Sequence, residues 1–162
     1  WINRILSWEP NARIVLHGVS MGAATVLMAS GEDLPGNVKA VIADCGYTSE
    51  WDEFQWEADA LHIPWFPVLN ATSVLSKIRD GYDFKQASAL AQVKKSRIPT
   101  LFIHGSSDEL VPYSMLGELY AAAACEKEEL TVEGAGHALS SSVAPTLYWR
   151  TVEDFIAKYL DR

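Results

Sequence analysis

The chain has 162 residues, 49% of them hydrophobic and 21% charged, which is the composition of a folded domain and excludes a disordered segment. Its formal net charge is −8, and this acidic balance argues against nucleic-acid binding, which needs a basic face. The only basic cluster, Lys94, Lys95 and Arg97, is interpreted as the solvated end of a helix. The two cysteines, Cys45 and Cys125, are too few for a disulfide scaffold and are expected to be free thiols.

Four short apolar runs predict strands, with helical segments between them. The strands are expected near residues 14–16, 38–43, 100–103 and 130–132. Because these runs are mostly continuous and not alternating, they indicate strands buried on both faces, as in a parallel sheet. The helices are expected at residues 21–30, 112–124 and 146–160. This order predicts an α/β fold with a mostly parallel, doubly wound sheet.

More than fifty residues separate the second and third predicted strands, too many for a structureless loop. This segment, residues 45–97, is expected to form helices near 49–60, 67–79 and 84–93. Its aromatic residues include Trp51, Phe54, Trp56, Trp65 and Phe66. A helical insertion at a sheet's edge could form a cap with an apolar acyl or alcohol pocket. The alternative is ordinary packing of these side chains against the sheet.

The strongest local motif is Gly18-Val19-Ser20-Met21-Gly22, a G-x-S-x-G pattern between a predicted strand and a predicted helix. In this arrangement Ser20 occupies a sharp strand-to-helix turn that exposes its hydroxyl. Gly18 and Gly22 lack Cβ atoms, so the strand and the helix can approach each other. The backbone N–H of Met21 then points to where an oxyanion would develop. The motif predicts a nucleophile elbow, with Ser20 as nucleophile and Met21 N–H as one donor of an oxyanion hole.

A serine nucleophile needs a histidine base that is oriented by a carboxylate. His137 follows the fourth predicted strand, among small residues that would let a loop carry the imidazole over the strand ends. We therefore predict that His137 is the base. His17 and His104 lie at the ends of predicted strands and are expected to have structural roles, while His62 in the insertion has no assigned role.

Asp108 is predicted to be the acid of a catalytic triad, because it follows the third strand and could reach His137 across adjacent strand ends. Asp44, at the end of the second strand, is the main rival, although it could instead bond a neighbouring loop. Glu109 and Asp83 are further alternatives. The scattered histidines and the lack of paired cysteines predict no metal, and no cofactor is expected.

Ser20, Asp108 and His137 with these flanking residues resemble the α/β-hydrolase superfamily. The stretches similar to its bacterial serine-peptidase-like and esterase-like branch are Gly81-Tyr82-Asp83-Phe84, residues 98–105, Val111-Pro112 and residues 133–137. The resemblance covers nearly the whole chain. It implies a serine hydrolase that acts through an acyl-enzyme on carboxylic esters or on small amides and peptides, with Ser20 as nucleophile, His137 as base and Asp108 as acid.

The chain departs from the pattern of that superfamily before its first predicted strand. Members carry several strands there, and a loop among them holds the second oxyanion donor, whereas here only a short helix near residues 2–8 precedes the strand. Residues 1–162 are therefore expected to be the C-terminal half of an α/β-hydrolase domain, with 45–97 as its helical insertion or cap. The nucleophile strand would lie at an open edge, which favours self-association or pairing with a missing N-terminal half.

Two other functions stay open on the sequence: a non-catalytic half-domain that needs an upstream partner, and an acyltransferase or thioesterase with the same triad. The small-molecule substrate is expected to be an ester or amide. No apolar stretch approaches the ~18 residues that span a bilayer, and no signal peptide opens the chain. A cytoplasmic location is favoured, although the first residue is Trp1 and not Met, which leaves an upstream signal or anchor open.

Overall fold

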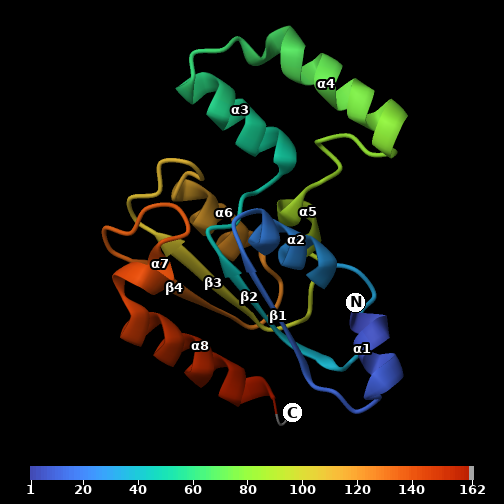
Figure 1. The fold of residues 1–162 in the computed structure, drawn as a ribbon, viewed down its shortest axis with the longest axis vertical. Coiled ribbons are helices and arrows are strands. Elements are labelled where there is room, and N and C mark those ends of the chain that lie inside the picture. The colour runs from blue at the N-terminus through green and yellow to red at the C-terminus, as the bar shows by residue number, and fades with distance from the viewer. Residues whose placement is uncertain (161–162) are drawn as a thin grey trace.

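The structure, a computed structural model, describes residues 1–160 and contains a parallel sheet of four strands (Figure 1). The strands are β1 (Ile14–Val19), β2 (Val38–Asp44), β3 (Thr100–Gly105) and β4 (Lys127–Val132). They pair in the order β1-β2-β3-β4, and every pair is parallel. The α/β class and the four predicted strands are confirmed. Within the described residues, β1 and β4 form the two edges of the sheet.

Helices connect and flank these strands. They are α1 (Ile2–Trp8), α2 (Met21–Ser30), α3 (Glu50–Ala60), α4 (Trp65–Asp80), α5 (Ala89–Val93), α6 (Ser114–Ala122), α7 (Ser140–Val143) and α8 (Pro145–Tyr159). The three helices predicted around the sheet are confirmed, with ends shifted by at most two residues. None of the helices formed by residues 1–160 is both long and apolar enough to cross a membrane.

The predicted helix at residues 84–93 is wrong in its first half. Asp83 Oδ1 accepts hydrogen bonds from the backbone N–H groups of Lys85 and Gln86, which makes a turn there. The helix begins only after Ser88, whose Oγ accepts from the N–H of Ala91. Short polar side chains of this kind compete with a helix for the backbone donors, so they favour turns and helix starts.

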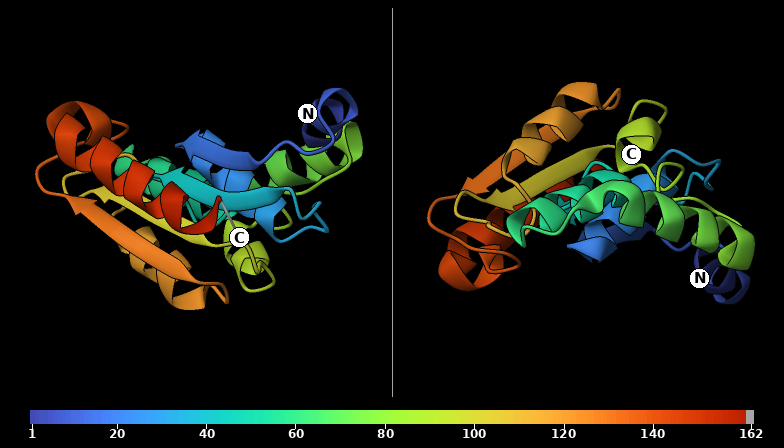
Figure 2. Two further views of the ribbon diagram at one scale, coloured as in Figure 1. Left: turned by 90° about the horizontal axis from the view of Figure 1, so that it is seen from below. Right: turned by 90° about the horizontal axis from the view of Figure 1, so that it is seen from above.

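The sheet is covered on both faces, as a doubly wound fold requires (Figure 1 and Figure 2). On one face, side chains of α2, α5 and α6 pack against Val41, Ala43 and Phe102. On the other face, α8 packs against Ile42 and Leu101, among others. The residues of α8 that do so are Tyr148, Val152, Phe155 and Tyr159, which share one stripe of the helix. The alternation of Val41, Ile42 and Ala43 between the two cores reflects the two-residue period of a strand.

Helices α3 and α4 stand apart from the sheet, as a pair that projects away from the rest of the molecule (Figure 1). They arise from the segment that follows β2, at the carboxyl ends of the strands. The third helix of this segment behaves differently, because Ala89 and Val93 of α5 are buried in the core under the sheet. Only α3 and α4 therefore have the position expected of a cap, and their role as a cap stays a prediction.

Candidate active site

The predicted nucleophile occupies a strained turn at the end of β1. Ser20 has φ 56° and ψ −121° and directly precedes α2. A conformation that L-residues rarely adopt costs about 1–3 kcal/mol and persists only where the surroundings hold it. Here the N–H of Ser20 donates to the carbonyl of Asp44 at 2.8 Å, and the N–H of Ala24 donates to the carbonyl of Ser20 at 3.1 Å. The turn lifts the hydroxyl clear of the sheet.

The two glycines of the motif have different roles. A Cβ at Gly18 would overlap the backbone carbonyl of Gly22, so the close approach of β1 and α2 requires glycine at position 18. A Cβ at Gly22 would have no described atom within 4 Å. The steric reason predicted for both residues therefore holds for Gly18, and for Gly22 the described residues do not require it. Met21 is the first residue of α2, so its N–H is among the donors that have no partner inside the helix.

The structure brings Ser20, His137 and Asp108 together in one hydrogen-bonded chain. Nε2 of His137 lies 2.8 Å from Oγ of Ser20, and Nδ1 of His137 lies 2.9 Å from Oδ2 of Asp108. In the tautomer that carries a proton on Nδ1, His137 donates to the carboxylate and its Nε2 can accept the serine proton. The three side chains come from three separate connections, which follow β1, β3 and β4.

Asp108 is held by more than the imidazole. Its side chain is buried, and Oδ1 accepts the backbone N–H groups of Leu110 and Val111, each at 3.0 Å. Oδ2 faces His137 and also lies 3.3 Å from Nε2 of His104. The backbone thus holds one carboxylate oxygen in place, and the other oxygen bonds the imidazole. An aspartate that orients a histidine base needs both of these contacts.

Of the histidines in the described residues, His137 is the one hydrogen-bonded to Oγ of Ser20, and the other three have different surroundings. His104 is buried, and its Nε2 lies 3.1 Å from the carbonyl of Val111. Burial lowers the pKa of His104, and burial also lowers the pKa of His17, so both favour the neutral form. Nε2 of His17 lies 3.0 Å from the hydroxyl of Tyr148. His62 follows α3, in a left-handed conformation with φ 57°.

The rival acid, Asp44, has partners other than His137, which lie on α7 and α8 and not on the neighbouring loop that the alternative interpretation expected. Ser140 Oγ donates to Asp44 Oδ1 at 3.0 Å, and the hydroxyl of Tyr148 also bonds this carboxylate. Since Tyr148 donates to Asp44, its oxygen accepts from His17, so the side chains form a chain of bonds from β1 to α7. Burial raises the pKa of Asp44. No local sequence pattern indicates this network, because its members are distant in the chain.

The two remaining candidate acids lie outside the hydrogen-bonded chain. Asp83 pairs with Lys77 at 3.1 Å beyond α4, and the hydrogen bond to Lys77 is the main cause that lowers the pKa of Asp83. Glu109 is next to Asp108 in the chain. Its backbone carbonyl accepts a hydrogen bond from Nε1 of Trp56 at 3.5 Å. Neither carboxylate bonds His137.

Cys45 is the buried neighbour of the site that the sequence did not assign. Its ligand atom and those of Asp108 and His137 lie within 4.8 Å of one another, an arrangement that could in geometry hold a metal ion. Burial, however, raises the pKa of the Cys45 thiol to about 12, so the thiolate that a metal needs is disfavoured. Asp108 and His137 are already bonded to each other. Cys45 and Cys125 are both free thiols, as predicted.

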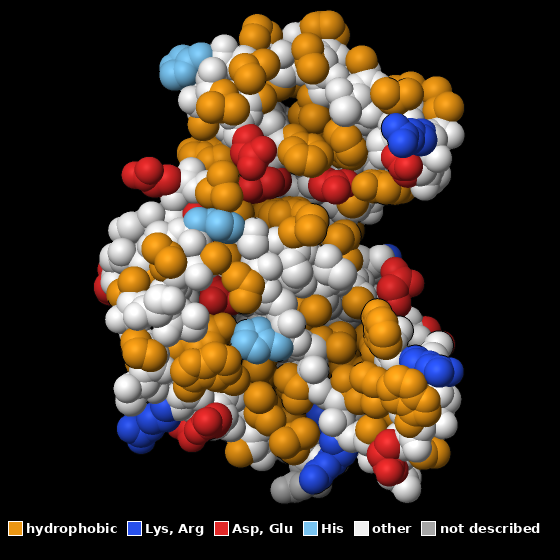
Figure 3. Space-filling view, in the orientation of Figure 1, with side chains coloured by type: hydrophobic (Ala, Val, Ile, Leu, Met, Phe, Trp, Pro, Cys, Tyr) orange, Lys and Arg blue, Asp and Glu red, His pale blue; other side chains and the backbone are white. Residues whose placement is uncertain are grey.

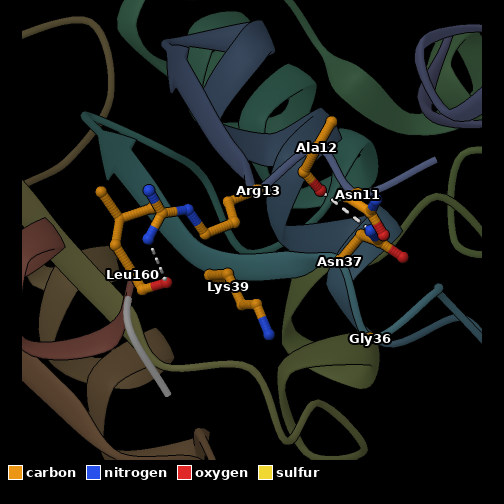
Figure 4. A pocket seen from close by; sticks show the side chains of 7 residues that line it. All are labelled: Asn11, Ala12, Arg13, Gly36, Asn37, Lys39 and Leu160. Atoms are coloured by element: carbon orange, nitrogen blue, oxygen red, sulfur yellow. Dashed lines mark hydrogen bonds between the residues drawn. The ribbon is translucent and has the colours of Figure 1, made fainter. Parts of the chain in front are cut away.

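One cavity lies at the opposite end of the sheet from Ser20. It has about 420 Å³ and is lined by residues near the amino ends of β1 and β2 and by Leu160 (Figure 4). There Arg13 Nη1 donates to the carbonyl of Leu160 at 3.3 Å, and Asn37 Nδ2 donates to the carbonyl of Ala12 at 2.9 Å. Because Ser20 follows the carboxyl end of β1, this cavity takes no part in its chemistry.

The chain belongs to the prolyl oligopeptidase family, whose profile matches residues 7–162. It is 31% identical over 161 residues to the uncharacterized protein YqkD of Bacillus subtilis, a match that covers 96% of this chain and 53% of that protein. The chain spans about half the length of the curated relatives it matches.

Solved structures show the same fold. An acylaminoacyl peptidase of Pyrococcus horikoshii superposes with a TM-score of 0.74 at 19% identity, over 98% of this chain and 26% of that one. The esterase domain of a Rhodothermus marinus protein superposes with a TM-score of 0.68 at 22% identity, over 97% of this chain and 65% of that one. The fold is that of the C-terminal half of an α/β hydrolase, as the resemblance implied.

Proposed function

We propose that this chain carries the catalytic residues of a serine hydrolase that cleaves carboxylic esters or small amides and peptides. The observation that carries the proposal is the continuous chain from Ser20 through His137 to Asp108, with contacts of 2.8 and 2.9 Å. Membership of the prolyl oligopeptidase family and the fold shared with a peptidase and an esterase support it.

The proposed reaction has two steps that use the same residues. Ser20 Oγ attacks the substrate carbonyl while its proton passes to Nε2 of His137, and that proton then goes to the leaving alcohol or amine as the acyl bond breaks. Water, deprotonated by His137, hydrolyses the resulting acyl-enzyme and restores the Ser20 hydroxyl. Asp108 keeps the imidazole in the required tautomer throughout.

The negative oxygen formed in each step needs hydrogen-bond donors. The N–H of Met21, at the positive end of the α2 dipole, is proposed as one of them. We expect the second donor to lie in a segment that corresponds to the part of the relatives that this chain does not span. The natural protein that contains this chain is therefore the material for the tests of activity.

The test combines active-site labelling with substitution of the nucleophile. A fluorophosphonate probe should label the natural protein at Ser20, and Ser20→Ala should abolish both labelling and hydrolysis of p-nitrophenyl acetate. In a comparable triad, loss of the serine lowered kcat about 10⁶-fold. A folded Ser20→Ala protein that keeps more than about one per cent of the activity would contradict the assignment, since a triad serine is worth orders of magnitude more. A folded protein that the probe does not label would favour the non-catalytic alternative.

We also propose that the outer edge of β1 is a pairing surface. Among residues 1–160, β1 has β2 as its one strand partner, so its other edge offers backbone donors and acceptors in a row. Apolar groups continue beside it, where Leu16 and Val26 line a cavity of about 520 Å³ together with residues of α1. Light scattering of the isolated chain should give a dimer or larger assembly. A monomer with normal esterase turnover would contradict the proposal.

A further inference from the structure

A second cavity lies between α3 and the loop that carries Asp108. It has about 250 Å³ and is lined by Trp56, Glu57, Ala60, Leu61, Glu109 and Leu110. It adjoins the candidate site directly, because Leu110 donates its backbone N–H to Asp108. Acidic side chains gather around the narrow region where the two projecting helices meet the body of the molecule (Figure 3).

The chemistry of the cavity wall is specific. Four of its six lining residues are apolar, and the other two, Glu57 and Glu109, are carboxylates. No Lys or Arg is among these lining residues. The cavity volume of about 250 Å³ is just below the roughly 300–1,000 Å³ of typical small-molecule sites, so it suits a small ligand. An alkyl chain of moderate length with a polar end would therefore match both its size and its lining.

A third carboxyl group, that of Glu53, is buried close to the cavity: it is not one of the lining residues, but it interacts electrostatically with Glu57, which is one. Glu53 lies on the same face of α3 as Glu57 and Ala60, one helical turn closer to the start of the helix. It is 6% exposed, and its Oε2 atom makes no hydrogen bond. Buried carboxyl oxygens without a hydrogen bond are uncommon, because burying such an atom without a partner destabilises the folded protein. An oxygen of this kind therefore points to a missing partner.

The surroundings of Glu53 carry charge of one sign. Burial is the main cause that raises the pKa of Glu53 to about 7, and the neighbouring carboxylates of Glu57 and Asp108 raise it further. No cation is among these causes. Because Glu57 lines the cavity and Asp108 belongs to the candidate site, the Glu53 carboxyl is coupled to both. A protonated amine placed here would satisfy the unbonded oxygen and offset the repulsion between the carboxylates.

We propose that this cavity binds the part of the substrate that is an alkyl chain ending in a protonated amine, with Glu53 and Glu57 as its specificity residues. The inference deepens the proposed function and rests on it for the claim that the bound amine belongs to a substrate. In this proposal the alkyl chain of the ligand contacts the apolar lining residues Trp56, Ala60, Leu61 and Leu110. The carboxylates of Glu53 and Glu57 bind its ammonium group.

The test is calorimetric binding of two matched probes, n-hexylammonium and n-hexanol, to the natural protein at pH 8, where Glu53 is mostly ionised. We expect the amine to bind and the alcohol to bind at least about tenfold more weakly, because a hydrogen bond to a charged group is lost. Glu53→Gln should weaken amine binding about tenfold or more and leave alcohol binding unchanged. Glu57→Gln tests the cavity rim with the same expectation.

The control variant is Glu153→Gln, an exposed carboxylate on α8, which should bind both probes as the wild type does. Equal amine binding by the wild type and a folded Glu53→Gln protein would overturn the inference, and so would equal binding of amine and alcohol. The measurement needs no turnover, so its outcome separates from that of the fluorophosphonate test. Glu53-dependent amine binding without labelling of Ser20 rejects the hydrolase alone, and labelling without amine binding rejects this inference alone.

Discussion

The hydroxyl of Ser140 donates a hydrogen bond to Oδ1 of Asp44 at 3.0 Å, although the two residues are 96 positions apart in the chain. The backbone carbonyl of the same Asp44 accepts the N–H of Ser20 at 2.8 Å. Asp44 therefore joins the turn that carries Ser20 to the start of α7, three residues after His137. An aspartate in this position can hold two loops in register without touching the reacting atoms.

Substitution of this aspartate should affect stability more than chemistry. In Asp44→Asn, the amide nitrogen cannot accept a hydrogen bond, so Ser140 or Tyr148 loses its acceptor at a cost of about 1–3 kcal/mol. Asp108→Asn should instead lower kcat about 10⁴-fold, because the imidazole loses its orientation. Denaturant unfolding and esterase assays of both variants check this. If Asp44→Asn is the more damaging to kcat, Asp108 is not the acid.

The packing of the two loops at Gly105 gives a second prediction. A Cβ at Gly105 would overlap the backbone carbonyl of Ala135, two residues before His137. Gly105→Ala should force apart the loops that carry Asp108 and His137, with a loss of about 1–3 kcal/mol in the free energy of unfolding and reduced activity.

The matched control for Gly105 is Gly117, inside α6. A Cβ there would have no described atom within 4 Å, and the residue is helical, so Gly117→Ala should stabilise the protein by about 0.5–1 kcal/mol. Denaturant midpoints for the two variants should move in opposite directions. Destabilisation of similar size by both would show that the carbonyl of Ala135 is not the cause.

The buried carboxyl of Glu53 predicts a pH dependence of stability. Burial raises its pKa from the ordinary 4.5 to about 7, so the folded protein binds the proton more tightly than the unfolded chain does. The unfolding free energy should therefore fall as pH rises from about 4.5 to 7, by at most about 3–4 kcal/mol at about 1.4 kcal/mol per pKa unit. Glu53→Gln removes this contribution. Urea unfolding should show the variant more stable than the wild type at pH 8 and similar at pH 4, whereas parallel pH profiles would reject the assignment.

The hydroxyl of Tyr148 should stabilise the fold. It bonds the buried Asp44 and lies 3.0 Å from Nε2 of His17, so Tyr148→Phe leaves the Asp44 carboxylate and the more exposed His17 ring each short of a partner. We expect a loss of about 1–3 kcal/mol in the free energy of unfolding. Tyr113→Phe is the control, because its hydroxyl bonds Thr131 at an exposed position and should matter less. Equal effects of the two substitutions on the thermal midpoint would argue against the buried network.

The sequence by itself determined the order of the elements and singled out the candidate nucleophile. Continuous apolar runs between helical patterns are local signals, so the four strands and the helices around them could be predicted without any long-range contact. The same holds for Ser20, since the turn that presents it depends on residues within the motif, above all on Gly18. The helix predicted at residues 84–93 is wrong in its first half. Asp83 makes a turn there, and the helix begins only after Ser88.

Only the tertiary structure showed which of the two candidate acids bonds His137, and which buried polar atoms have no hydrogen-bond partner. Asp44 and Asp108 both follow parallel strands, so their local sequences allow the same role. The difference arises from sheet order: β3 lies next to β4, whose loop carries His137, while the Asp44 side chain turns to α7 and α8. Glu53 is one of several acids on α3 in the sequence, and its burial without a partner depends on elements that come together only in the fold. Hydrogen bonding and burial are properties of groups distant in the chain, which no local pattern encodes.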